Sequence, residues 1–181
     1  MAPPEILPPT NTMTLTRTLP ILALVLVVMA GPARADFNDG VVALMSGNYD
    51  TALATFVPLA ETSDHAYAQY FLGRMYAVGQ GVEQNLGTAA EWYRKAAEKG
   101  VGDASYRLGA LYERGKGVPS DMEYAYGWYS VAAHVGNAKG ADALKKVAAK
   151  LSETERTEAQ KLSRDLIKKY GVVPKSTSRR K

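Results

Sequence analysis

Apolar side chains recur at intervals of three and four residues through the middle of the chain, which is the period of an amphipathic α-helix. One apolar stripe consists of Ala68, Leu72, Met75 and Tyr76. A second stripe consists of Ala89, Trp92, Tyr93, Ala96 and Ala97. Gly79-Gln80-Gly81 lies between them, and its glycines allow the chain to end one helix and turn back. The pattern predicts a hairpin of two helices packed through these stripes.

The same pattern returns 36 residues later. The repeated positions are Leu72, Gly73, Tyr76, Gly79, Gly81, Trp92 and Ala96 in one copy, and Leu108, Gly109, Tyr112, Gly115, Gly117, Trp128 and Ala132 in the other. We expect both tryptophans in the core, because they lie on stripes lined by alanine. Gly73 is expected to let the second helix approach closely, and Asn85 and Asp121 to cap the helices that follow them.

The flanking segments extend this arrangement in both directions. Residues 36-66 read as a degenerate first repeat, since Phe56 and Ala60 precede Trp92 and Ala96 by 36 residues. Residues 67-102 and 103-138 are the clear copies, and 139-171 read as capping helices with a capping box at Ser152 to Glu155 and a stop at Gly171. The predicted fold is all-α, an α-solenoid of antiparallel helix hairpins with a C-terminal capping helix pair.

These residues resemble a known repeat. The string Ala68-x-x-x-Leu72-Gly73-x-x-Tyr76-x-x-Gly79-x-Gly81-Val82, followed by Ala89-x-x-Trp92-Tyr93-Arg94-Lys95-Ala96-Ala97-x-x-Gly100, is similar to the Sel1-like repeat, a relative of the tetratricopeptide repeat. Asn85 stands where that family usually has aspartate, and Gly127 replaces a helix former beside Trp128. The resemblance implies an adaptor or scaffold, and exported bacterial members are associated with envelope signalling and complex assembly.

Residues 1-35 have the layout of a signal peptide. Arg17 precedes an apolar run from Ile21 to Ala30, and the small residues that end at Ala35 predict cleavage before Asp36. Translation from Met13 gives a more ordinary signal than translation from Met1. The expected location is periplasmic or secreted, with no stable membrane insertion after cleavage. An uncleaved leader that tethers the protein to the inner membrane is the alternative.

The positive charge is concentrated at the C-terminus. The whole chain has a formal net charge of +4, yet residues 36–150 contain 11 Lys and Arg against 13 Asp and Glu, whereas residues 151–181 contain 9 against 4. Residues 172-181 have too few apolar side chains to fold and read as a disordered basic tail. The tail either attracts an acidic partner or anionic lipid, or only adds solubility. Export argues against nucleic acid as the partner.

Few residues in this sequence are arranged as catalytic or metal-binding residues usually are. Cysteine is absent, which excludes thiolate metal sites, cysteine nucleophiles and disulfides. His65 and His134 have no partner at metal-ligand spacing, and an imidazole near a turn is usually exposed to solvent. We therefore expect no enzyme activity, catalytic residue, metal or cofactor. The alternative is a hydrolase acting on cell-wall or β-lactam substrates, because secreted relatives of the repeat have been linked to that chemistry. Those relatives are cysteine-rich, which weakens the link.

The expected function is binding of a protein segment from the cell envelope. If the repeats stack as in tetratricopeptide proteins, the first helix of each hairpin lines the concave surface. The candidate contact residues on these helices are Tyr67, Tyr70, Arg74, Asp103, Tyr106, Glu113 and Arg114. Tyrosine and arginine dominate the binding energy of many interfaces, although aromatic residues at these spacings also pack between repeats. About three repeats are the minimum for a stable stack, which favours stabilisation by a partner or a homodimer.

Overall fold

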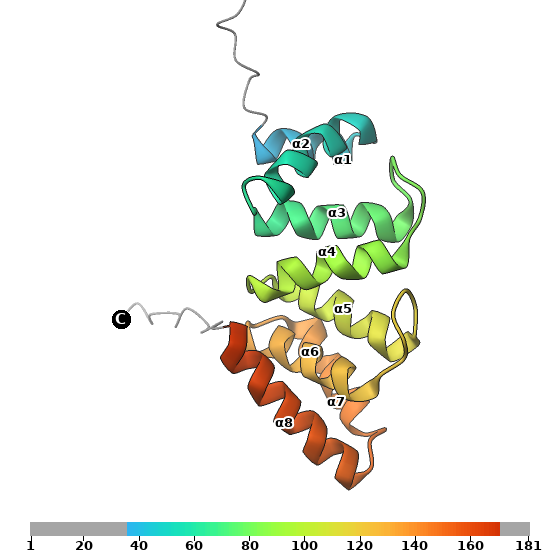
Figure 1. Cartoon of the computed structure of the whole chain (residues 1–181), viewed down its shortest axis with the longest axis vertical. Coiled ribbons are helices and arrows are strands. Elements are labelled where there is room, and N and C mark those ends of the chain that lie inside the picture. The colour runs from blue at the N-terminus through green and yellow to red at the C-terminus, as the bar shows by residue number, and fades with distance from the viewer. Residues whose placement is uncertain (1–35, 171–181) are drawn as a thin grey trace, which may run out of the picture. The chain divides into compact units, whose positions relative to one another are not determined.

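The computed structural model describes residues 36–170, and within that range the chain consists of eight α-helices (Figure 1). The helices are α1 (Phe37–Met45), α2 (Tyr49–Glu61), α3 (Ala66–Val78), α4 (Leu86–Glu98), α5 (Gly102–Arg114), α6 (Met122–His134), α7 (Ala138–Ala148) and α8 (Glu153–Tyr170). The expected signal peptide, its cleavage site at Ala35, the stop at Gly171 and the basic tail lie outside the described residues.

Consecutive helices pack as hairpins, and the hairpins pack on one another in chain order. Helix α1 pairs with α2, α3 with α4, and α5 with α6, while α2 packs on α3 and α4 on α5 (Figure 1). The predicted all-α solenoid of helix hairpins is confirmed. Phe56 and Ala60 of the degenerate first repeat are buried on α2, as their register predicts.

Two glycines allow the helices of each clear repeat to approach closely. A Cβ atom built on Gly73 would lie 2.6 Å from the ring of Tyr93, and one built on Gly109 would lie 2.8 Å from the ring of Tyr129. Neither distance is compatible with a side chain, so each tyrosine packs directly over a glycine backbone. Both tyrosines are buried, which explains why the Leu-Gly pair recurs in register with the second-helix aromatic residues.

The predicted caps are present and repeat with the same geometry. The Asn85 side chain accepts a hydrogen bond from the Thr88 backbone N–H at 3.0 Å, and the Asp121 side chain accepts one from Tyr124 at 2.9 Å. The backbone N–H groups of Asn85 and Asp121 donate to the carbonyl oxygens of Tyr76 and Tyr112. These bonds hold the loop after the first helix against that helix and fix where the second helix begins.

His65 has a structural role that the sequence did not indicate. Its Nδ1 atom accepts a hydrogen bond from the Ala68 backbone N–H at 3.2 Å, so the imidazole caps α3. The ring also lies 4.7 Å from the ring of Phe37, measured between centroids. His65 is therefore partly buried rather than simply exposed to solvent, because the Phe37 ring of α1 lies against it.

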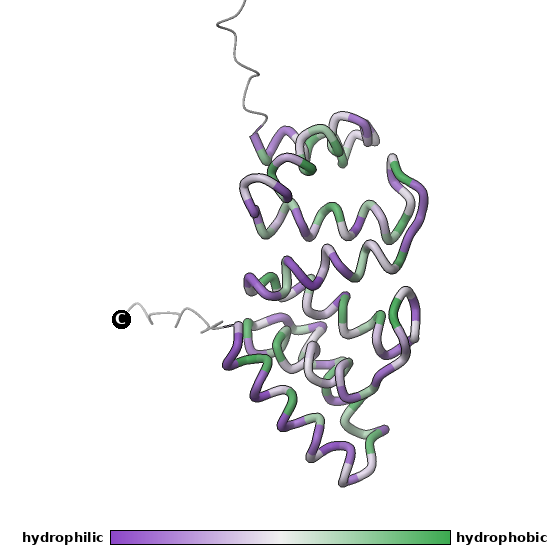
Figure 2. Tube along the Cα trace, viewed as in Figure 1, coloured by the Kyte–Doolittle hydropathy of each residue, from purple (hydrophilic) through white to green (hydrophobic). Residues whose placement is uncertain are grey.

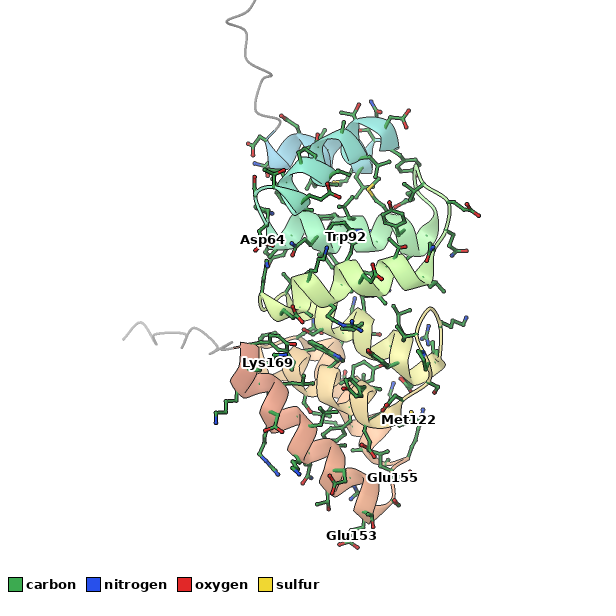
Figure 3. All side chains as sticks on the ribbon, viewed as in Figure 1. Asp64, Trp92, Met122, Glu153, Glu155 and Lys169 are labelled. Carbon is green, nitrogen blue, oxygen red and sulfur yellow. The ribbon has the colours of Figure 1, made fainter. Side chains whose placement is uncertain are left out.

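The two tryptophans differ in burial despite their equivalent positions. Trp128 is 2% exposed and stacks on the ring of Tyr170, with centroids 5.7 Å apart. Trp92 is only partly buried, and the Lys95 ammonium lies 4.1 Å from its ring centroid (Figure 3). The core prediction thus holds fully for Trp128 alone. The reason is that α8 packs across α6, and no described helix covers α4 in the same way.

Helices α7 and α8 close the C-terminal end of the stack, but they pack mainly on α6 rather than on each other. Gly127 favours the close α6–α8 contact, because a Cβ atom there would lie 2.9 Å from Leu166 Cδ1 and that side chain would have to shift. This contact gives a physical reason for the glycine that departs from the repeat pattern. Among the described residues, no helix is long and apolar enough to cross a membrane.

The sequence of α8 fits its position at the end of the stack. The Ser152 Oγ atom accepts from the Glu155 backbone N–H while the Glu155 carboxylate accepts from the Ser152 backbone N–H, which confirms the capping box. The helix begins with Glu153 and Glu155 and ends near Lys169, an order that complements the helix dipole (Figure 3). Apolar and polar positions alternate along it, and its outer positions are exposed (Figure 2).

The hairpin turns allow a matched test of how tightly the repeats pack. Gly117 has φ +75°, and a Cβ atom there would lie 2.3 Å from the Leu86 carbonyl carbon, whereas Gly47 has φ +77° and no atom within 4 Å of that position. Gly47→Ala should lower the free energy of unfolding by about 1 kcal/mol, from backbone strain alone. Gly117→Ala should lower the free energy of unfolding by about 1 kcal/mol more than Gly47→Ala does, because the loop must also move away from α4. Urea denaturation measures both losses, and equal losses would show that the loop moves freely.

Candidate partner-binding surface

Tyr67, Tyr70 and Arg74, three of the predicted contact residues, lie together on α3. Tyr67 is 56% exposed, which is unusual for so large an aromatic side chain. Tyr70 is partly buried between the rings of Phe71 and Tyr93, at centroid distances of 5.4 and 6.0 Å. The Arg74 guanidinium carbon lies 6.0 Å from the Tyr70 ring centroid, within cation–π range. These side chains form an aromatic surface with a positive charge beside it.

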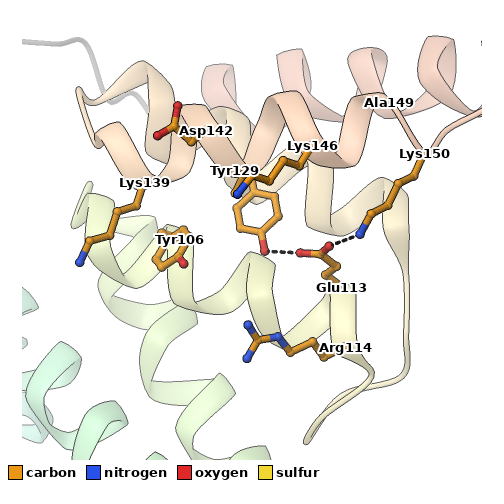
Figure 4. Close-up of a pocket in the computed structure, with 10 residues that line it drawn as sticks. Tyr106, Glu113, Arg114, Tyr129, Lys139, Asp142, Lys146, Ala149 and Lys150 are labelled. Atoms are coloured by element: carbon orange, nitrogen blue, oxygen red, sulfur yellow. Dashed lines mark hydrogen bonds and ion pairs between the residues drawn. The ribbon is translucent and has the colours of Figure 1, made fainter.

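Three more of the predicted residues line a pocket on α5. Tyr106, Glu113 and Arg114 face α7 across a cavity of about 700 Å³ (Figure 4). The remaining lining residues are Tyr129, Lys139, Asp142, Ala143, Lys146, Ala149 and Lys150. The volume is within the range of roughly 300–1,000 Å³ that is usual for ligand pockets. We refer to this cavity as the α5–α7 pocket.

Glu113 is held in place inside the pocket by two hydrogen bonds. Its carboxylate accepts from the Tyr129 hydroxyl at 2.7 Å and from the Lys150 ammonium at 2.6 Å (Figure 4). Burial acts to raise the pKa of Glu113, but the bonds from Lys150 and Tyr129 outweigh it and lower that pKa. Burial, followed by the bond to Glu113, raises the pKa of Tyr129. At neutral pH the carboxylate is therefore ionised and already paired.

The other charges around the pocket are mainly positive. Among residues 36–170, Lys150 pairs with Glu113 and Asp142 with Lys145, the latter at 3.9 Å. Arg114, Lys139 and Lys146 form no ion pair within the same range. Lys139, Lys146 and Arg114 are exposed, so their charged ends are accessible from solvent. The pocket thus offers three cationic groups to a molecule that enters it.

Sequence reasoning missed the contribution of α7, because residues 139-171 were assigned to a cap. The missed side chains follow a helical spacing along one face, at Lys139, Asp142, Ala143, Lys146, Ala149 and Lys150. That spacing was visible in the sequence. What it did not reveal is that this exposed face borders α5 across an open cavity.

Asp103 lies apart from both groups. Its carboxylate accepts a hydrogen bond at 2.9 Å from the side chain of Asn137, which itself caps α7. The side chain is exposed, so this bond leaves part of it open to a partner. No cluster of three or more histidine, aspartate or glutamate side chains within residues 36–170 could hold a metal ion. His134 lies exposed at the end of α6.

Comparison with known families agrees with the geometry of the hairpins. The Sel1 repeat model matches twice, at residues 66–101 and 102–137, one residue earlier than the boundaries expected from the sequence. The chain is a Sel1 repeat protein. Among curated proteins, no sequence matches this Sel1 repeat protein.

Two solved structures are similar to this Sel1 repeat protein over most of its length. One is a protective antigen of uropathogenic Escherichia coli with a Sel1-like repeat fold, at 30% identity and TM-score 0.70, covering 74% of this chain and 29% of the antigen. The other is a Sel1 repeat protein from Oxalobacter formigenes, at 26% identity and TM-score 0.59, covering 72% of this chain and 56% of the other. This Sel1 repeat protein therefore spans from under a third to just over half the length of these relatives.

Proposed function

We propose that this Sel1 repeat protein is a non-catalytic interaction module that binds a segment of a partner protein along α3, α5 and α7. Sel1 repeats generally mediate protein interactions. The observation that carries the proposal is that Tyr106, Glu113 and Arg114, singled out from their positions on the repeat, line one pocket. The exposed ring of Tyr67 on α3 extends the candidate surface beyond that pocket.

The residue types on this surface support binding rather than only packing. Tyrosine and arginine offer large contact areas together with hydrogen-bonding groups, and they are enriched at binding hot spots. Tyr70 and Tyr106 are partly buried against Tyr93 and Tyr129, so their rings are held in place before a partner arrives. Such preorganisation lowers the entropy cost of binding.

The proposed setting is the bacterial cell envelope, as an adaptor, scaffold or regulator of an envelope complex. Support comes from the three-part pattern of residues 1–35, which is typical of a cleaved signal. In that setting the mature protein would begin at Asp36, one residue before α1. The mass of the mature protein tests this part of the proposal, because an uncleaved leader would leave the whole segment in place.

Site-specific photocrosslinking in living cells tests partner binding directly. A photoreactive residue replaces Tyr67 or Tyr106, and a control replaces Glu91, which is exposed on the second helix α4. We expect one envelope protein to be captured from the two tyrosine positions and not from Glu91. Capture of the protein itself would favour a homodimer, and equal capture from all three positions would contradict a defined surface.

Two variants then measure how much the surface contributes. Tyr106→Ala and Arg74→Glu should each reduce recovery of the captured partner about tenfold, which corresponds to the loss of about 1.4 kcal/mol of binding free energy. Circular dichroism should show unchanged helix content, since neither side chain is fully buried. Unaltered recovery in both variants would contradict the surface. Turnover of a chromogenic β-lactam by the purified protein would support the hydrolase instead.

A further inference from the structure

We propose that the α5–α7 pocket is a carboxylate-binding subsite, so that the partner segment it receives is an acidic peptide. This inference rests on the proposed interaction function and specifies the chemistry of its ligand. Its basis is the set of charges that face the cavity: Arg114 from α5 and Lys139 and Lys146 from α7. None of the three has an ion-pair partner among residues 36–170.

The acidic groups of the pocket do not cancel these charges. The Glu113 carboxylate accepts hydrogen bonds from Lys150 and Tyr129, so it is already paired within the protein. Asp142 has Lys145 at 3.9 Å as an ion-pair partner outside the pocket lining. The charged lining therefore comprises four basic and two acidic side chains, and Lys150 and Glu113 among them form an ion pair with each other. An entering carboxylate meets a net positive field at short range.

The shape of the pocket fits an extended segment better than an isolated ion. Lys139 and Lys146 are seven residues apart on α7, a rise of about 10 Å along the helix. In an extended segment the side chains of residues 1 and 3 point to the same face and lie about 7 Å apart, a span that the long lysine side chains can match. Tyr106 and Ala143 supply an apolar wall between the charged groups. A tetrapeptide could thus present a carboxylate near each lysine while its stem packs on the tyrosine ring.

The charge of the wider surface argues for a peptide rather than a nucleic acid. Residues 36–150 carry 11 Lys and Arg against 13 Asp and Glu, so the repeat body has no extended positive field. Nucleic acids bind through many phosphate contacts and need such a field. The repeat body is slightly acidic, so most of its surface does not attract an acidic peptide. Only the local cationic pocket does, which confines the binding of a short acidic segment to that place.

Fluorescence anisotropy with labelled tetraglutamate, and with tetraglutamine as the neutral probe, tests the subsite. The purified protein should bind tetraglutamate at least tenfold more tightly than tetraglutamine. Lys139→Glu combined with Lys146→Glu should remove at least tenfold of the tetraglutamate affinity. The matched control is Lys161→Glu with Arg164→Glu, an equal charge change on exposed positions of α8, and it should bind like the wild type. Raising the salt from about 0.05 to about 0.5 M should weaken binding, because the contacts are ionic.

Several results would overturn the inference. Equal losses in the pocket variant and the α8 control would show that only net charge matters. Equal affinity for tetraglutamate and tetraglutamine would show that the pocket does not recognise carboxylates. Equal affinity for tetraglutamate and inorganic phosphate would show that it binds any anion rather than a peptide. The in-cell crosslinking separates this inference from the proposed function. A partner captured at Tyr106 and unaffected by the lysine changes would leave the interaction function standing and refute the carboxylate subsite.

Discussion

Trp128→Ala is expected to lower the free energy of unfolding by about 3–5 kcal/mol, the usual loss when a large buried aromatic residue is truncated. Trp128 is 2% exposed and packs within the cluster that contains Leu108 and Leu166. Its ring also stacks on Tyr170 of α8 at 5.7 Å. Removing the indole therefore leaves a cavity on α6 and removes one of the contacts that hold the end of α8, beside the hydrogen bond from Tyr170 to Glu98. Small domains have only about 5–15 kcal/mol of stability, so this variant will be close to unfolding.

Trp92→Ala is the matched control, because the same residue type is changed 36 positions earlier in the repeat. Trp92 is only partly buried, and the Lys95 ammonium lies over one face of its ring. Its truncation should therefore lower the free energy of unfolding by only about 1–2 kcal/mol. Trp128→Phe, which keeps an aromatic ring, should fall between the two alanine variants. Urea denaturation followed by circular dichroism measures all three. Equal losses for the two alanine variants would contradict the role assigned to α8.

The helices and their hairpins could be predicted from the sequence because their determinants are local. The spacing of Leu72, Tyr76, Trp92 and Ala96 defines buried faces, and Asn85 defines where a helix begins. The 36-residue repeat then gives the stacking, since identical units pack on one another in the same way. Gly73 and Gly109 are close to the second-helix tyrosines for the same reason, and both contacts are present.

The C-terminal part could be predicted only in outline. An amphipathic pattern shows that a helix has a buried face, but it does not show which neighbour that face contacts. The pattern of α8 therefore predicted a capping helix but not its position across α6. Gly127 was the one local clue, because Glu91 occupies the equivalent position in the preceding copy. The difference between Trp92 and Trp128 follows from that position and could not be obtained from their equivalent sequence environments.

The candidate site shows the same division. Tyr106, Glu113 and Arg114 were found because they share one helix, and helix periodicity decides which of its residues face the same way. Lys139 and Lys146 were missed because their proximity to α5 depends on how α7 docks, which is a tertiary contact between residues of different helices. The ionic partner of Glu113 was missed for the same reason, since Lys150 is 37 positions away.

Three tyrosines make the fold sensitive to high pH. Burial raises the pKa of Tyr93 to about 12, and burial followed by the hydrogen bond to Glu98 raises the pKa of Tyr170 to about 12. The pKa of Tyr129 is raised by burial and by Glu113. In the unfolded chain these phenols ionise near the ordinary tyrosine pKa of 10.0. Each therefore contributes stability that is fully present below pH 10 and is lost as the pH rises through its folded-state pKa.

Tyr93→Phe is therefore expected to protect the protein against alkali. Tyr93 is 3% exposed, and phenylalanine keeps its packing over Gly73 while removing the ionisable hydroxyl. At neutral pH the change in stability should be small. As the pH rises, the wild type should lose more stability than the variant, by roughly 1 kcal/mol at about pH 11 and by roughly 3 kcal/mol once the folded-state phenol also ionises. Urea denaturation at stepped pH measures the difference, in which lysine titration cancels because both proteins share it. Tyr67→Phe is the matched control, because it makes the same chemical change at a side chain that is 56% exposed. Parallel curves for Tyr93→Phe and the wild type would show that the Tyr93 hydroxyl reaches solvent without disturbing the packing of α3 on α4.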